Sequence, residues 1–131
     1  MAPHEVEGVV TKVSPHGVPE IVERLVAMVE DRGMKVFAVI DHSGEADRVG
    51  LELRDTKLVL FGNPKGGTPA MEAVPLVALE LPLKVLIWDD GGETKVSYAA
   101  PRVLAERYGL SDEVAAPLAG IEALTDALVA G

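Results

Sequence analysis

LKVLIWDDGGETKVSY, residues 83–98, is the stretch that decides the fold. Two apolar runs, Leu83–Trp88 and Thr94–Tyr98, flank an acidic and glycine-rich turn at residues 89–93. Such a turn between two apolar runs indicates a β-hairpin, because glycine adopts the backbone angles that tight turns require. A hairpin joins antiparallel strands, so this stretch argues against a doubly wound parallel sheet.

Three further strands are expected upstream of the hairpin. Residues 5–13 alternate in polarity, which is typical of a first strand. Met34–Ile40 is a valine-rich apolar run, which predicts a second strand buried on both faces or nearly so. The third strand is the short run Leu58–Phe61. Residues 43–56 are polar and mixed, with at most one turn of helix near Glu45–Val49.

Helices are expected between and after these strands. From Pro19 the apolar residues recur at spacings of three and four, and Gly33 predicts the end of that helix. Residues 101–108 predict a helix that Gly109 stops, and another helix is expected from Pro117 onward. The order is therefore strand, helix, four strands, helix. We predict an α+β fold with a mainly antiparallel sheet and helices packed on one face, because this arrangement buries every apolar helix face.

Composition excludes several classes of function. The chain has 131 residues, 48% of them hydrophobic and 25% charged, so we expect residues 1–131 to form a single globular domain. Its net charge of -9 opposes binding to nucleic acids and to anionic membranes. Without cysteine it has no thiolate ligands for zinc or iron–sulfur clusters. We expect no cofactor, no signal peptide and a cytoplasmic protein.

GNPKGGT, residues 62–68, is the most specific motif for function. It follows a strand and precedes a helix expected to open at Thr68–Pro69, a context in which backbone N–H groups can bind an anion. A nucleotide-binding P-loop needs its lysine directly after the last glycine, whereas Lys65 precedes Gly67, which argues against ATP or GTP hydrolysis. Two interpretations stay open: a site for a small polar or anionic ligand, and a structural turn capped by Thr68.

His42 is the one weak candidate for a catalytic residue. It follows the second strand and Asp41, where a histidine can act as a general base or as a hydrogen-bond partner of a ligand. Asp41 could orient His42 only if the strand has already ended, because neighbouring strand residues point to opposite faces. The alternative is a turn histidine satisfied by the backbone. No metal site is expected, since His4 and His16 are far from His42 in the chain.

Four short motifs occur in order over about residues 18–110. They are Val39-Ile40-Asp41-His42; Phe61-Gly62-Asn63-Pro64-Lys65 with Gly67-Thr68 and Met71; Pro75 followed by Leu81-Pro82-Leu83; and Tyr98 with Pro101. In these motifs the chain resembles the domain of unknown function 302 family. The resemblance implies a TATA-binding-protein-like fold without DNA binding, and it implies no particular activity. Val74 and Ala99–Ala100 depart from the family pattern, in which more polar residues are expected.

The resemblance also implies a common site. Its expected ligand-binding residues are His42, Asn63, Lys65, Gly67, Thr68 and Met71. Our first hypothesis is a binding module for a small polar or anionic ligand at the Gly-Asn-Pro-Lys loop. The second is a homodimeric structural or interaction protein without catalysis. The third is an enzyme that uses His42 as its general base.

Overall fold

The computed structural model describes residues 4–131. Within them, five strands form one antiparallel sheet in the order β1-β5-β4-β3-β2. The strands are β1 (Val9–Ser14), β2 (Lys35–Asp41), β3 (Thr56–Gly62), β4 (Leu83–Asp90) and β5 (Glu93–Ala99). The predicted α+β fold with a mainly antiparallel sheet is confirmed.

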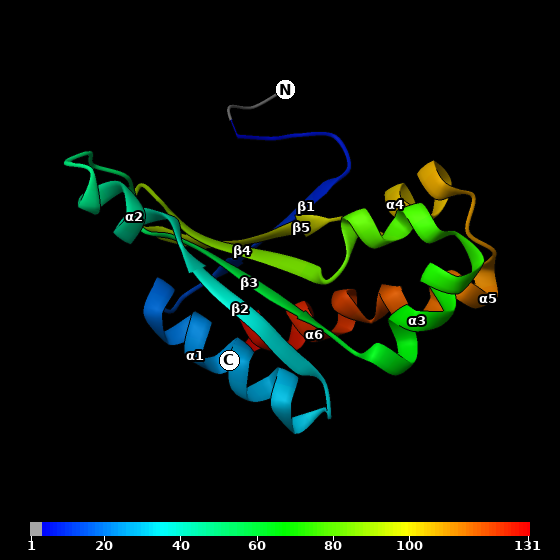
Figure 1. Ribbon diagram of the computed structural model, residues 1–131. Helices are drawn as coiled ribbons and strands as arrows, with labels where there is room; N and C mark the ends of the chain where they lie inside the picture. Colours follow the sequence, from blue (N-terminus) through cyan, green and yellow to red (C-terminus); the bar gives the residue numbers. More distant parts are fainter. Residues whose placement is uncertain (1–3) are drawn as a thin grey trace.

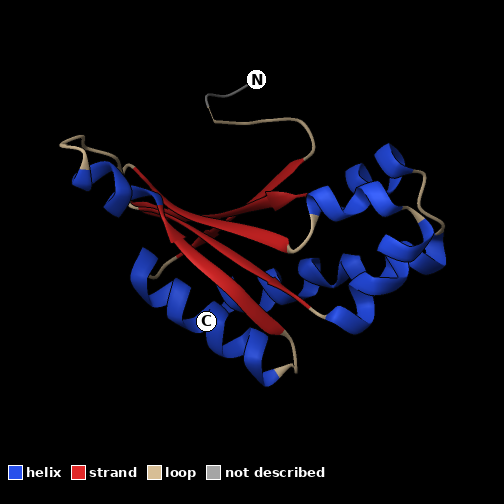
Figure 2. Ribbon diagram, viewed as in Figure 1, coloured by secondary structure: helices blue, strands red, loops and turns tan. Residues whose placement is uncertain are grey.

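Helices cover one face of this sheet and both of its ends (Figures 1 and 2). The covered face carries α1 (Val18–Asp31) and α6 (Ile121–Ala130). One end carries α2 (His42–Arg48). At the other end lies a helical lobe, made of α3 (Pro64–Ala73), the 3₁₀ helix η1 (Pro75–Glu80), α4 (Pro101–Tyr108), α5 (Asp112–Ala115) and the 3₁₀ helix η2 (Ala116–Gly120). No helix of the described chain lies on the second face of the sheet.

The main core lies between the sheet and the helices α1 and α6. On α1 the residues Ile21, Leu25 and Val29 are fully buried, at the four-residue spacing of one helix face. They pack with buried residues of the strands and of α6, which are Val59, Phe61, Val85, Ile87, Val96, Tyr98, Ile121, Leu124 and Leu128. Each large side chain of this kind contributes about 1.5–3 kcal/mol when fully buried.

A second, smaller core holds the helical lobe together. Ala70 of α3, Val77 of η1 and Leu118 of η2 are buried against one another. This cluster lies beyond the end of the sheet, so α3 is held between the strand that precedes it and the helices that follow β5. The cluster fixes the position of α3, which carries Lys65, Gly67, Thr68 and Met71.

The hairpin between β4 and β5 forms as predicted. Gly91 and Gly92 have φ angles of 64° and 96°, which is the left-handed pair that a two-residue hairpin turn requires. The helix α4 ends at Tyr108, and Gly109 follows it with a φ of 62°. Both predictions hold because they depend on local backbone requirements.

Three local predictions are wrong. The first strand begins at Val9 rather than residue 5, after a turn in which the Val9 N–H donates to Val6 O over 3.1 Å. The second strand is not buried on both faces: β2 is an edge strand, and Phe37 and Val39 are 50% and 44% exposed. Two helical turns form at α2, where at most one was expected.

None of the helices in residues 4–131 has both the length and the apolar character needed to cross a membrane.

Candidate functional site

The Gly-Asn-Pro-Lys motif is the start of a helix. Strand β3 ends at Gly62, Asn63 is the N-cap of α3, and Pro64 is the first helical residue. The side chain of Asn63 accepts a hydrogen bond of 3.0 Å from the Lys65 N–H. The prediction that this helix opens at Thr68–Pro69 is therefore wrong, because the cap and the proline at the first helical position come five residues earlier.

The backbone N–H groups at this helix start already have partners. Pro64 has no N–H, and that of Lys65 is bonded to the Asn63 side chain. Both Gly66 and Gly67 donate to the carbonyl oxygen of Asn63 over 2.9 Å. An anion-binding loop needs such groups to be free to point at the ligand. Residues 64–67 therefore lack the free backbone donors that the hypothesis of an anion-binding loop requires.

The two faces of α3 differ in character. Gly66, Gly67 and Met71 are partly buried and face the rest of the lobe. In contrast, Lys65 and Thr68 are exposed. The helix thus separates the predicted site residues, with the glycines and the methionine on its inner side and the charged and hydroxyl side chains on its outer side.

An apolar cleft of about 460 Å³ lies between the inner side of α3 and the end of the sheet. This volume lies within the range of roughly 300–1,000 Å³ that small-molecule sites occupy. The lining residues are Met34, Phe37, Gly62, Asn63, Pro64, Gly66, Gly67, Met71, Leu81, Pro82, Leu83, Pro117 and Leu118. Among these, only Asn63 has oxygen or nitrogen atoms in its side chain, and its oxygen is used as the helix cap.

Glycine at two positions shapes the wall of the cleft. A Cβ atom added at Gly66 would lie 3.1 Å from Cβ of Pro117, so glycine lets α3 approach η2 closely. One added at Gly67 would lie 3.7 Å from Leu81 Cδ1 and 3.9 Å from Met71 Cε, which are ordinary contacts. A larger side chain at position 67 would therefore point toward the lining of the cleft.

His42 lies at the opposite end of the sheet from this cleft. In the antiparallel pairing of β2 with β3, Asp41 is opposite Lys57 and Lys35 is opposite Gly62. The five residue steps from Lys57 to Gly62 span about 17 Å at the rise of a β-strand. Figure 1 shows α2, which His42 begins, and α3 beyond the two ends of these strands. The grouping of His42 with Asn63, Lys65, Gly67, Thr68 and Met71 in one site is thus corrected by the strand register.

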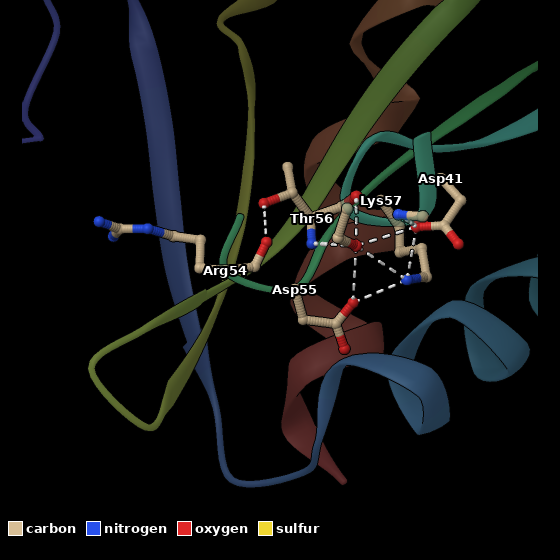
Figure 3. A network of polar contacts seen from close by, with 7 residues as sticks. Asp41, Arg54, Asp55, Thr56 and Lys57 are labelled. Atoms are coloured by element: carbon tan, nitrogen blue, oxygen red, sulfur yellow. Dashed lines mark hydrogen bonds and ion pairs between the residues drawn. The ribbon is translucent and has the colours of Figure 1, made fainter. Parts of the chain in front are cut away.

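A network of charged residues surrounds the start of α2 (Figure 3). Lys57 Nζ lies 2.8 Å from Asp41 Oδ1, 2.7 Å from Asp55 Oδ1 and 3.2 Å from Ser43 Oγ. Asp41 also accepts a 2.9 Å hydrogen bond from the Gly44 N–H, which caps the helix. This network could not be predicted from the sequence, because Lys57 meets partners that are 2 to 16 positions away and lie on different segments.

Protonation states in this network argue for a structural role. The hydrogen bonds from Lys57, from the Gly44 N–H and from Ser43 lower the pKa of Asp41 to about 2. Burial lowers the pKa of Lys57, but its hydrogen bonds to Asp41 and Asp55 outweigh burial and raise it. A protonated lysine has no lone pair with which to activate Ser43. The network therefore fastens α2 to the start of β3.

Within residues 4–131, no three side chains of the histidine, aspartate or glutamate type are grouped so that they could hold a metal ion.

Comparison with known proteins assigns the chain to a family. The family model described as "Domain of unknown function DUF302" matches residues 10–128. The chain belongs to this family. A crystal structure of an uncharacterised conserved DUF302 protein from Bacillus stearothermophilus has the same fold, with a TM-score of 0.80 at 21% sequence identity. The likeness covers 95% of this DUF302 chain and 97% of the other.

Curated relatives of this DUF302 chain are longer proteins. Over 111 residues the chain is 41% identical to a Brucella suis biovar 1 (strain 1330) protein named fluoride-specific ion channel FluC 1. The match covers 82% of this chain but 44% of that protein. A Brucella abortus biovar 1 (strain 9-941) protein of the same name is also 41% identical, with 41% of its length covered. The chain thus spans less than half the length of these relatives.

Proposed function

We propose that this DUF302 chain is a binding module for a small ligand with an apolar body. The observation that carries the proposal is the lining of the 460 Å³ cleft, in which apolar side chains and glycines surround the single amide of Asn63. An apolar ligand gains about 25 cal/mol for each Å² of surface that it removes from water. The size and the lining of the cleft fit that source of affinity.

The cleft changes the class of ligand expected from the sequence. The sequence predicts a polar or anionic ligand held by backbone N–H groups together with Lys65 and Thr68. Those N–H groups are bonded to Asn63, and both side chains are exposed on the outer side of α3. What supports binding here is the shape and the apolar character of the cleft. The cleft gives no support to His42 as a general base, because His42 lies at the other end of the sheet.

A neutral probe tests this proposal. We expect 1-octanol to shift the amide NMR signals of residues around the cleft, above all Phe37, Gly67 and Met71. Gly67→Leu places a side chain in the cleft wall and should weaken the binding of 1-octanol at least tenfold. Thr68→Leu is the matched control, because it adds a leucine to the same helix on the exposed side. Equal binding by both variants, or shifts spread evenly over the sheet, would contradict the proposal.

A second candidate function rests on the Brucella relatives. In them, the region that matches this chain is 41–44% of a protein named as a fluoride-specific ion channel. The Bacillus stearothermophilus chain, in contrast, is almost fully covered by the same fold. The domain is therefore found both as nearly a whole chain and as part of a longer one. This supports a role for the family as an accessory domain that works with an ion channel.

Fluoride flux tests the accessory role. We expect the Brucella suis protein in liposomes to conduct fluoride both with and without the matched region. Removal of that region should change the amount of flux or its response to added ligand, while fluoride selectivity is kept. Identical flux and ligand response in the two forms would show that the domain does not act on the channel.

A further inference from the structure

The two edge strands of the sheet differ in how their free sides are protected. Strand β1 has a charge in its middle, Lys12, which forms an ion pair with a carboxylate of α6. Strand β2 has neither a charge nor a proline between its end residues Lys35 and Asp41. Its side chains Phe37 and Val39 are exposed. Charges and prolines usually protect edge strands, because an unprotected apolar edge pairs with a further strand. The edge at β2 is therefore the one suited to pairing.

The sequence of β2 is complementary to its own reverse. When two copies of β2 pair antiparallel about Ala38, Lys35 of one copy is opposite Asp41 of the other. In the same register Phe37 is opposite Val39. The two-fold symmetry makes each of these pairs occur twice. Opposite charges and large apolar side chains placed directly across from one another both stabilise paired strands. A second copy of β2 thus has the charge pattern that this edge requires.

Both charged ends of β2 are able to take a partner. Lys35 is exposed and forms no ion pair within residues 4–131. The Asp41 side chain pairs with Lys57 but stays 50% exposed. In the described chain its hydrogen bonds from Ser43, Gly44 and Lys57 all end on Oδ1. Its other oxygen, Oδ2, is left for the ammonium group of a second copy.

The position of α1 leaves room for this pairing. Antiparallel pairing of two identical edges places the helices of both copies on the same face of the joined sheet. Helix α1 packs on β4, β3 and β2, so it is centred on β3 rather than on the edge strand. The two α1 helices would then be three strand spacings apart, about 14 Å. This distance exceeds the 8–10 Å or so at which helices pack, so the helices do not block the pairing.

We propose that β2 is the interface of a homodimer, in which two copies of the chain pair their edge strands antiparallel about Ala38 and join their sheets into one. The pairing places Val39 of the second copy opposite Phe37, which lines the cleft. A bulge increases the twist at Phe37, because this residue alone of the described strand β2 has no partner in β3. Each copy contributes one twisted strand, so we expect a dimer that dissociates on dilution.

The oligomeric state in solution tests the interface. We expect sedimentation velocity to show a shift from monomer to dimer as the protein concentration rises. Val39→Lys places a charge in the middle of the edge and should abolish the dimer. Val9→Lys is the matched control on the opposite edge strand, where Val9 is 43% exposed against 44% for Val39, and it should leave the dimer unchanged. A monomer at every concentration, or an equal loss in both variants, would overturn the proposal.

A charge reversal tests the pairing of the ends. Lys35→Glu replaces two attractive pairs by two repulsive ones, so it should raise the dissociation constant of the dimer by roughly tenfold. Lys65→Glu makes the same change at an exposed lysine of α3 and should have little effect. Thermal melting of each variant checks that its fold is intact. Equal effects of the two reversals would show a general charge effect and overturn the pairing of Lys35 with Asp41.

Disulfide formation tests the register, since the chain has no cysteine of its own. In the proposed dimer the two Ala38 Cα atoms are roughly 4.5–5.5 Å apart, which suits a disulfide. The two Val39 residues are diagonal neighbours at about 7–8 Å, which is too far. Under mild oxidation Ala38→Cys should therefore form a covalent dimer. Val39→Cys should form one only when mixed with Phe37→Cys. Cross-linking of Val9→Cys as fast as that of Ala38→Cys, or of Val39→Cys alone, would overturn this register.

Discussion

Asn63 and Lys65 are joined by a hydrogen bond of 3.0 Å, in which the Lys65 N–H donates to Asn63 Oδ1. The family resemblance implied that both residues bind a ligand. In the structure the bond between them caps the start of α3, and Lys65 is exposed. The Gly-Asn-Pro-Lys motif therefore serves first of all to start a helix at the end of a strand.

Removing this cap should destabilise the protein. We expect Asn63→Ala to lower the free energy of unfolding by about 1 kcal/mol, since the Lys65 N–H loses its acceptor. Urea denaturation followed by circular dichroism measures the change. Asn63→Asp is the control, because aspartate caps a helix equally well and should retain most of the stability. If Asn63→Ala and Asn63→Asp lower the free energy of unfolding equally, the side chain of Asn63 does not act as a cap.

The adjacent glycines of α3 should respond differently to alanine. At Gly67 an added Cβ makes only ordinary contacts, so Gly67→Ala should raise the free energy of unfolding by about 0.5–1 kcal/mol through helix propensity. At Gly66 the Cβ would lie 3.1 Å from Pro117, which must move. Gly66→Ala should therefore raise the free energy of unfolding by less than Gly67→Ala does, or should lower it. Equal gains in thermal melting would show that α3 and η2 are not in close contact.

Features set by the local backbone could be predicted from the sequence. The glycines after α4 and in the β4–β5 turn adopt the left-handed angles expected of them. The exposure of β2 could not be predicted, because the same apolar run can form a central strand or an edge strand. Only the pairing of the strands shows that β2 lies at the edge. Whether the fold also belongs to the TATA-binding-protein-like class stays a prediction.

The start of α3 was ambiguous for a specific reason. Asn63-Pro64 and Thr68-Pro69 are both a capping residue followed by proline, so each is a sound signal for a helix start. The structure uses the first, and Pro69 lies inside the helix. In this helix Ala70 packs against Val77 of η1 and Leu118 of η2. Leu118 lies far away in the chain, so this packing could not be read from the sequence around α3.

The cleft itself was not predictable from any single motif. Its lining comes from β2, the β3–α3 junction, α3, the segment after η1, and η2. Phe37, Leu81 and Pro117 each read as ordinary apolar or turn residues in the sequence. Of the family motif, Asn63, Gly67 and Met71 line the cleft, whereas Lys65 and Thr68 do not. That any of these residues binds a ligand stays a prediction.

The ion pair between Asp41 and Lys57 should be visible in a pH titration. NMR of the Asp41 side-chain carboxyl should give a pKa of about 2, well below the ordinary value of 3.8. Lys57→Met removes the strongest cause of that shift and should move the pKa toward 3.8. The remaining hydrogen bonds from Gly44 and Ser43 should keep it somewhat lower.

The same pair predicts how stability depends on acid. Because folding lowers the pKa of Asp41, its contribution to stability is present above pH 3.8 and is lost as the pH falls toward about 2. The difference in urea midpoint between the wild type and Lys57→Met should therefore shrink over this interval. A difference that stays constant between these pH values would show that the pair does not stabilise the fold.

The hydrogen bond between Tyr108 and Glu80 should make the stability of the helical lobe depend on pH in the alkaline range. The Tyr108 hydroxyl donates a 2.7 Å hydrogen bond to Glu80 Oε2, which joins the end of α4 to the end of η1. This bond, followed by burial and the charge of Glu80, raises the pKa of Tyr108 above 10.0. The contribution of this bond to stability is present below pH 10.0 and is lost as the pH rises through the higher pKa of Tyr108 in the folded protein.

The urea midpoint of the wild type should then fall more steeply above pH 10.0 than that of Tyr108→Phe. In Glu80→Gln, absorbance at alkaline pH should show that Tyr108 titrates at a lower pH than in the wild type. Parallel pH profiles for the wild type and Tyr108→Phe would mean that this bond does not hold α4 against η1.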